Sequence, residues 1–532
     1  MRELLYPLIV SSLHGLAWTG DHLLAVDPRT GYLLKIDVNN EQTAISNGPA
    51  VDQWLDVTGL SLQSGEVWAL REDRILRAAP QSYVLETAIE LDYLAEGLAL
   101  SDTEIFVSCQ RSQFIFVYDR TTGERKRILD APGIGEENLT FDSGSLWVCD
   151  SVEQTVYCLD PETGRVRFNI LTPYAKPKGL VFAGTCLYVS YSQEEDFIEE
   201  DPNRYNRQSI ETRGKTFIHR LKFITKPDVP YTLSNGYLIE MTYCEETAGR
   251  ESVALENVEW RIALPADTPR QKLVEVEAIG APFREVLIEG QRVAVFSFDA
   301  LAEGEIQVFG WRAVIEVHGI KYQIAPDDLD LNLEIPEAIK AQYLIDDDDL
   351  AMDTRRVREA TYDAVGDLTN PLEQMLAIRE FVYDKLDYQV VNSISSPDTV
   401  LLRGKGSCGE YVGVMLALAR LTGIPCRTVG RYKCPEHLGG FGTPLEPRYN
   451  HVWIEFYLAG YGWVPCESSA DDPGQRPYSQ RFFLGLPWGH VEVGKGINFE
   501  ETNVRGYSLS DLSINHVRFK ILKELPAEAE TL

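Results

Sequence analysis

The chain has 532 residues, too many for one hydrophobic core, so several domains are expected. Hydrophobic residues make up 44% and charged residues 25%, which excludes a disordered or fibrous chain and indicates an ordinary globular protein. The formal net charge of -31 repels nucleic-acid phosphates and anionic membrane surfaces, so we expect neither nucleic acid nor membrane as a partner.

The first residues contain a short apolar stretch that Glu3 and Pro7 interrupt, and we interpret it as a β-strand rather than an export signal. No apolar run approaches the roughly 20 residues that a helix needs to span a bilayer. The nine cysteines are scattered, odd in number and without a CxxC pair, which is typical of a reducing compartment. Together these features predict a cytoplasmic protein.

Residues 1–226 repeat a short apolar motif at a spacing of roughly 40 residues, the period of a propeller blade. A second apolar run follows each copy, and in several copies a third run follows with a turn behind it. We predict an all-β propeller of five blades, with six as the alternative. The motifs are Gly15-Leu-Ala-Trp, Gly59-Leu-Ser-Leu, Gly97-Leu-Ala-Leu, Asn138-Leu-Thr-Phe and Gly179-Leu-Val-Phe.

One segment of this region, LWVCDSVEQTVYCLDPETGRV, resembles repeats of NHL and gluconolactonase-like propellers. An acidic insertion from about Gln193 to Lys215 interrupts the fifth copy, and we expect it to be an exposed loop. A propeller offers a surface for a protein partner. Chemistry in the propeller is an alternative, since Glu96, Glu137 and Asn138 lie at blade starts, but they form no convincing ligand set. We therefore predict no metal and no cofactor.

Beyond residue 226 the pattern changes to longer alternating strands, about six of them over residues 227–335, which predicts a β-sandwich. Nothing in this region has catalytic spacing. Over residues 336–507 helical periodicity comes first and strands follow, an order typical of α+β papain-like domains. Residues 508–532 are expected to be a C-terminal tail.

Cys408 lies in the first turn of an apolar helix predicted over Ser407–Leu421. The helix dipole and the unpaired amide groups at this position stabilise a thiolate, and the same amides can bind a developing oxyanion. Gly406 and Gly409 allow a substrate backbone to approach the sulfur. A buried structural cysteine is the alternative, but it does not explain glycines on both sides. We interpret Cys408 as a nucleophile.

The segment YNHVWIEFYLAGYGWVPCE predicts a hairpin with Leu458-Ala-Gly460 as its loop. If Tyr457 pairs with Tyr461, His451 faces Glu467, with Cβ atoms about 4.5–5.5 Å apart. A carboxylate at this distance fixes the imidazole tautomer and leaves the other ring nitrogen for the thiol. The hypothesis is that His451 is the base and that Glu467 orients it. A polar pair on a solvated face is the alternative.

Three motifs in this order resemble the transglutaminase-like superfamily: Gly406-Ser-Cys408, Asn450-His-Val-Trp453 and Trp463-Val-Pro-Cys-Glu467. The resemblance covers about residues 336–507 and implies a papain-like fold with a Cys-His-carboxylate triad. It also implies that an aromatic residue before the cysteine loop, here Tyr388, helps to form the oxyanion hole.

The chain departs from the family at the third position of the triad, where aspartate is usual and Glu467 stands here. Asp471 and Asp472 are therefore alternatives for the orienting carboxylate. His437 and His490 have no suitably spaced carboxylate and are interpreted as surface or packing residues.

These residues predict thiol-dependent acyl transfer on a peptide or protein amide. With water as second nucleophile the protein is a cysteine peptidase or amidase, which we favour slightly, and with an amine it is a transglutaminase. The alternative is a non-catalytic binding or scaffold protein that carries a relic thiol domain.

Overall fold

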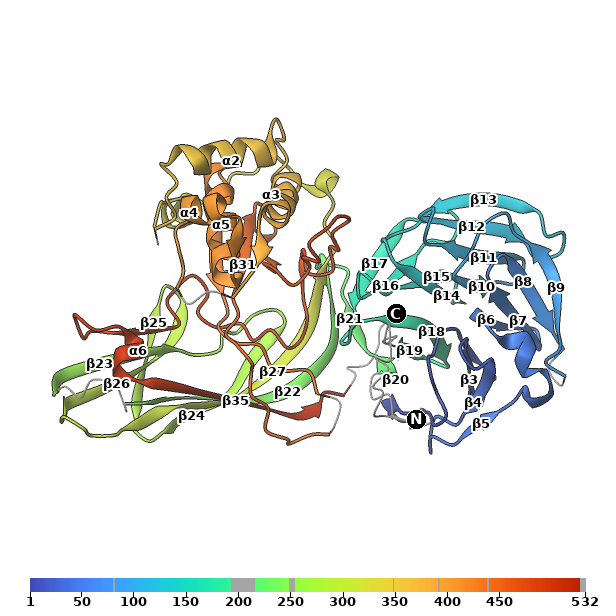
Figure 1. Cartoon of the computed structure of the whole chain (residues 1–532), viewed down its shortest axis with the longest axis horizontal. Coiled ribbons are helices and arrows are strands. Elements are labelled where there is room, and N and C mark those ends of the chain that lie inside the picture. Colours follow the sequence, from blue (N-terminus) through green and yellow to red (C-terminus); the bar gives the residue numbers. More distant parts are fainter. Residues whose placement is uncertain are drawn as a thin grey trace, which may run out of the picture. The chain divides into compact units, whose positions relative to one another are not determined.

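The computed structural model describes residues 1–79, 82–192, 216–247, 254–347, 349–390, 393–437 and 440–526. The chain forms two compact units, Met1–Ile224 and Thr225–Ala529. Figure 1 shows a ring of sheets in the first unit and, in the second, long strands together with a group of helices. The insertion expected between Gln193 and Lys215 lies outside the described residues. In the described parts of the chain, no helix is long and apolar enough to cross a membrane.

The first unit is a propeller of five four-stranded antiparallel blades, counted over its described residues, which agrees with the predicted fold class. Four blades are built from consecutive strands (Figure 1). They are β2 (Leu16–Trp18), β3 (Leu23–Asp27), β4 (Tyr32–Ile36) and β5 (Thr43–Ile45); β6 (Val57–Gln63), β7 (Glu66–Arg71), β8 (Arg74–Ala78) and β9 (Leu85–Glu90); β10 (Gly97–Leu100), β11 (Glu104–Cys109), β12 (Phe114–Asp119) and β13 (Arg125–Asp130); and β14 (Glu136–Asp142), β15 (Ser145–Asp150), β16 (Thr155–Leu159) and β17 (Val166–Leu171). A 3₁₀ helix, η1 (Gly48–Trp54), follows β5.

The fifth blade joins the two ends of this unit. Its strands are β18 (Pro177–Ala183), β19 (Cys186–Ser192), β20 (Thr216–Leu221) and β1 (Leu4–Leu5). In β1, Leu4 lies opposite His219 and Leu5 opposite Ile218. The N-terminal residues therefore form a strand, as predicted, and this strand closes the ring because it hydrogen-bonds to the last blade.

The repeated glycines lie where neighbouring blades approach each other most closely. A Cβ atom on Gly97 would lie 2.4 Å from the carbonyl oxygen of Glu137, and one on Gly179 would lie 2.0 Å from that of His14. Both distances are far below van der Waals contact, so only glycine fits there. In the fourth copy, Asn138 instead uses its side-chain amide to donate hydrogen bonds of 3.0 and 3.1 Å to backbone carbonyls of two other blades.

The second unit contains a sandwich of two sheets, which agrees with the prediction, and β21 (Phe223–Thr225) leads into it. Large side chains from both sheets, including Trp260, Trp311 and Phe296, are fully buried between them. One sheet contains β22 (Tyr231–Glu246), β24 (Gln271–Ile279), β27 (Val308–Tyr322), β33 (Gly485–Leu486) and β35 (Ile514–Glu524), and the other contains β23 (Leu255–Ala263), β25 (Phe283–Ile288), β26 (Gln291–Leu301) and β34 (Glu500–Thr502).

Three of these strands, β33 to β35, come from residues that the sequence predicts to belong to the catalytic domain or to the tail. The predicted tail is wrong over β35, which pairs along β22 from Ile514 opposite Glu246 to Glu524 opposite Tyr237. The sandwich is also not complete within residues 227–335. The reason is that a strand as long as β22 has unpaired amide and carbonyl groups along both edges, and both edges need a partner.

Helices cover one side of a small sheet in the remainder of this unit (Figure 1). The apolar face of α5 packs with β30 and β31 in one core. The helix predicted over Ser407–Leu421 is present as α5, and Thr354 and Asn370 cap two further helices. The elements are η2 (Pro326–Asp328), α1 (Glu337–Tyr343), α2 (Arg355–Val365), α3 (Pro371–Lys385), β28 (Asp387–Tyr388), α4 (Pro397–Arg403), β29 (Lys405–Gly406), α5 (Cys408–Leu421), β30 (Cys426–Val429), β31 (Trp453–Leu458), β32 (Gly462–Cys466) and α6 (Leu509–Leu512).

Candidate active site

Cys408 is the first residue of α5, as the sequence predicted. Ser407 caps the helix in a capping box, in which its backbone amide donates to Glu410 Oε2 at 3.1 Å. The other oxygen of this buried carboxylate accepts hydrogen bonds from the amide of Ser395 at 3.0 Å and from Arg403 at 2.7 Å. Glu410 therefore fixes the residues before the helix against its N-terminus, where the amide groups have no partner within the helix.

The Cys408 thiol lies beside His451. Its Sγ is 3.9 Å from the carbonyl oxygen of Asn450, and only 7% of the residue is exposed. Burial by itself raises the pKa of the thiol, but the His451 imidazole and the Val452 amide outweigh burial, so the pKa of Cys408 is lowered. Burial in turn lowers the pKa of His451, whereas Glu467 and the thiol raise it, and the result is a raised pKa. The pair therefore favours thiolate and imidazolium.

Glu467 is fully buried and contacts His451 directly, from Oε1 to Nε2. Its other oxygen accepts hydrogen bonds from the amides of Ser469 at 2.8 Å and Ala470 at 2.5 Å. Burial favours the neutral acid, but the contact with His451 holds the pKa of Glu467 well below its usual range. The carboxylate is therefore ionised, and the longer arm of glutamate reaches the imidazole.

The hairpin that brings these residues together has a different register from the predicted one. Leu458 pairs with Gly462 and Tyr457 with Trp463, so Tyr457 does not face Tyr461 and His451 does not face Glu467. The difference is two residues, which keeps every side chain on its predicted face. His451 lies two residues before Trp453, the first residue of β31. Its side chain therefore meets that of Glu467 diagonally rather than directly across the hairpin.

The alternative carboxylates have other partners. Asp471 pairs with Arg379 at 2.8 Å and Arg481 at 2.6 Å, and Asp472 accepts a hydrogen bond from the Tyr411 hydroxyl at 2.8 Å. Glu467 is therefore the carboxylate that contacts the imidazole.

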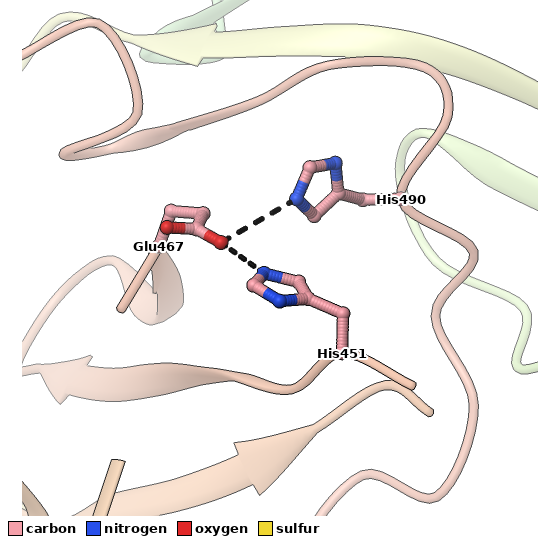
Figure 2. A group of neighbouring side chains, drawn as sticks. All are labelled: His451, Glu467 and His490. Atoms are coloured by element: carbon pink, nitrogen blue, oxygen red, sulfur yellow. Dashed lines mark hydrogen bonds and ion pairs between the residues drawn. The ribbon is translucent and has the colours of Figure 1, made fainter. Parts of the chain in front are cut away.

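His490 belongs to the same cluster, and its interpretation as a packing residue without a carboxylate is wrong. Figure 2 shows Glu467 with both histidines; His490 Nε2 lies 3.8 Å from Glu467 Oε1, the oxygen that contacts His451. Its ring lies 4.9 Å from that of Trp453, edge to face. Burial lowers the pKa of His490 to about 3, so its imidazole is neutral at physiological pH. No regular spacing relates residues 467 and 490, and only the folded chain brings them together.

His451, Glu467 and His490 each offer one ligand atom to a metal, and these atoms lie within 4.8 Å of one another. Two ligand atoms on a tetrahedral zinc ion are about 3.3 Å apart, since each bond is about 2.0–2.1 Å long. The direct contact between His451 and Glu467 leaves no such space. The geometry therefore fits an electrostatic chain from His490 through Glu467 to His451 better than a metal site.

Tyr388 lies beside Cys408. It is on β28, which pairs with β29 in parallel and places Tyr388 opposite Gly406, and 44% of the residue is exposed. Burial and the neighbouring Cys408 raise the pKa of Tyr388 to about 12. Its hydroxyl therefore keeps its proton and can donate a hydrogen bond near the sulfur.

A cavity of about 1080 Å³ lies elsewhere in this unit, with Arg427, Glu455 and Trp463 of the small sheet in its wall. This cavity is not lined by Cys408, His451 or Glu467. The guanidinium of Arg427 lies 4.0 Å from the Trp463 ring and pairs with Glu455 at 2.8 Å. The charged groups of this wall are thus satisfied by one another.

Residues 358–468, which include all three predicted triad residues, match the transglutaminase-like superfamily. An uncharacterised protein of Haemophilus influenzae is 30% identical over 164 residues, which cover 27% of this chain and 42% of that relative. The chain thus spans less than half the length of the Haemophilus protein.

Three solved structures match parts of the chain. A candidate cysteine protease from Cytophaga hutchinsonii is 14% identical, with 57% of this chain and 96% of that chain covered and a TM-score of 0.38. The glutaminyl cyclase of Myxococcus xanthus is 14% identical, with 36% and 89% covered and a TM-score of 0.30. Regucalcin from Agrobacterium tumefaciens, a calcium-binding protein, is 11% identical, with 41% and 93% covered and a TM-score of 0.29.

Proposed function

We propose that this chain, whose residues 358–468 form a transglutaminase-like domain, transfers acyl groups from peptide or protein amides through Cys408, His451 and Glu467. One observation carries the proposal: a thiol at the start of a helix lies beside an imidazole that contacts a buried carboxylate, and the pKa of the thiol is lowered while that of the imidazole is raised. These shifts are what nucleophilic catalysis by cysteine requires.

In the proposed reaction the Cys408 thiolate attacks the amide carbonyl carbon, and a C–S bond forms as negative charge moves to the carbonyl oxygen. The amide groups at the start of α5 and the Tyr388 hydroxyl stabilise this oxyanion. His451 gives its proton to the leaving nitrogen, the C–N bond breaks, and an acyl-enzyme remains. Glu467 keeps the ring oriented and compensates its charge.

The second nucleophile decides between hydrolysis and transamidation. Water, deprotonated by His451, gives hydrolysis, which we favour because water is always available; an amine gives transamidation by the same route. Incubating the protein with an amide substrate and an isotope-labelled amine separates the two outcomes, since mass spectrometry shows whether the label enters the product. The propeller is proposed as a surface for a protein partner.

Selective alkylation tests the state of the nucleophile. Iodoacetamide at pH 6.5, followed by peptide mass spectrometry, is expected to label Cys408 at least about 100 times faster than Cys426 or Cys466, because only thiolates react. Burial raises the pKa of both control thiols and leaves them fully shielded, with that of Cys466 at about 12. Because the pKa of Cys408 is lowered, Cys408 should still be labelled at a pH low enough to protonate ordinary thiols and make them unreactive. Equal rates at the three cysteines would favour a relic domain.

His490 is expected to position Glu467. The change His490→Phe keeps the ring packing but removes the polar edge near the carboxylate, and we expect kcat to fall by about 10-fold with KM unchanged. The change His490→Gln restores a donor and should recover most of this loss. The matched control is His516→Gln, an exposed histidine whose partner is Glu246 at 2.8 Å. A fall in KM and kcat together, with reduced thermal stability in both His490 variants, would indicate a packing role only.

A further inference from the structure

Exposed apolar side chains border the thiol on more than one side. Tyr388, Ile394 and Tyr449 are 44%, 74% and 54% exposed. Exposed aromatic and branched side chains at a proposed nucleophile indicate a surface that becomes covered when a ligand binds.

Three observations place these side chains near Cys408. Tyr388 lies opposite Gly406 in the β28–β29 pair and interacts with the thiol. Ile394 lies over the residue after the cysteine, because a Cβ atom on Gly409 would be 3.0 Å from Ile394 Cδ1. Tyr449 precedes Asn450, whose carbonyl oxygen is 3.9 Å from the sulfur, and the phenol of Tyr449 is near enough to Tyr388 to help raise the pKa of that residue.

The segment that carries Ile394 is held in place rather than loosely attached. The amide of Ser395 donates to Glu410 at 3.0 Å, and Glu410 is only 1% exposed. A buried carboxylate thus fixes an isoleucine that is itself mostly in solvent. Because the backbone beside Ile394 is already fixed, little conformational entropy is lost when a ligand binds against this side chain.

We propose that Tyr388, Ile394 and Tyr449 form a subsite for a bulky apolar side chain of the acyl donor, next to the amide that Cys408 attacks. This inference rests on the proposed function, since it uses the attack at Cys408 to define where the donor lies. The substrate class is a peptide or protein segment with leucine or phenylalanine beside the reacting amide. A substrate with an acidic residue at this place is disfavoured, because its carboxylate would be desolvated against apolar side chains without gaining a cationic partner.

Turnover of peptide aminomethylcoumarin amides tests the subsite. Substrates that differ only in the residue before the scissile amide (Leu, Phe, Ser or Asp) should give kcat/KM values at least about 10-fold higher for Leu and Phe than for Asp. The change Ile394→Ser should lower kcat/KM for the Leu substrate by about 10-fold, through KM, and leave the Ser substrate unchanged. The matched control is Tyr362→Ser, which removes a 69% exposed aromatic side chain from α2 in the same unit.

Peptidyl chloromethyl ketones separate failure of the subsite from failure of the proposed function. The thiolate displaces chloride, so a C–S bond forms and chloride leaves without any acyl-enzyme step. The Leu reagent should inactivate Cys408 at least about 10 times faster than the Asp reagent, and Ile394→Ser should remove this difference. If no amide is turned over but this preference holds, the subsite stands and the acyl-transfer proposal falls. Equal rates for Leu and Asp in the unmodified protein would overturn the subsite.

Discussion

Replacing Cys408 with alanine is expected to lower kcat for peptide amides by about 10⁴-fold or more, because Cys408 is the thiol that interacts with His451, whereas the nearby Cys466 is fully buried and has a pKa raised to about 12. The substitution removes a single sulfur atom and leaves only a small cavity, so truncation should leave the fold intact. Circular dichroism and thermal melting check the fold, and steady-state kinetics on a peptide panel measure the loss.

The matched control for this substitution is Cys244→Ala. Cys244 is also buried, at 8% exposure, but lies on β22 of the sandwich, and its pKa is raised by burial. Its truncation should leave kcat and KM unchanged. Turnover at the unmodified rate in Cys408→Ala would end the assignment of the nucleophile.

The change Glu467→Gln is expected to lower kcat by roughly 10³- to 10⁴-fold while it keeps the size of the side chain. Two effects combine. The amide no longer fixes the ring tautomer, and it no longer raises the pKa of His451, which the carboxylate does in the native protein. Since proton donation to the leaving nitrogen needs the imidazolium, the alkaline limb of the kcat profile should move to lower pH. A pH series from 5 to 9 measures this shift directly.

The informative companion is Glu467→Asp, which keeps the charge and shortens the arm by one methylene group. It should retain more activity than Glu467→Gln and keep the alkaline limb nearer its native position. An unchanged kcat in Glu467→Gln, with an unchanged alkaline limb, would show that the contact between His451 and the carboxylate is structural only.

The ionisation of Glu467 and His451 also makes the stability of the folded protein depend on pH. Glu467 has a folded-state pKa well below its usual value, so the stability that it contributes is present above the unfolded pKa and is lost as pH falls through the folded one. His451 has the opposite sign: its pKa is raised, so its contribution is complete below the unfolded pKa and is lost as pH rises through the folded value. The ion pair is therefore most stable between these two limits.

Local signals in the sequence were sufficient for the helix that begins at Cys408 and for the order of the motifs. Ser407 with Glu410 caps this helix, and Asn370 followed by proline begins α3 in a similar way. These residues act on groups within four positions of themselves, so their effect can be read without knowing the fold. The repeated glycines indicated blades for a similar reason, since each copy contains its own strand and turn pattern.

The register of the catalytic hairpin was not determined in this way. The predicted and observed pairings differ by two residues, and both place the same side chains on the same face. The positive φ of Gly460 and Gly462, +87° and +83°, selects the loop Ala459 to Tyr461 instead of the predicted one. The predicted contact between His451 and Glu467 still forms in this register, because a glutamate side chain is long enough to reach a diagonal neighbour.

The sequence by itself thus determined the order of the propeller, the sandwich and the transglutaminase-like domain, and the helix that begins at Cys408, because each depends on neighbours in the chain. Only the tertiary structure decided that β1 closes the propeller, that β35 completes the sandwich beside β22, and that His490 stands behind Glu467. These contacts join residues far apart in the chain. They consist of hydrogen bonds between strand edges and of interactions between buried polar groups, and neither produces a periodic pattern in the sequence.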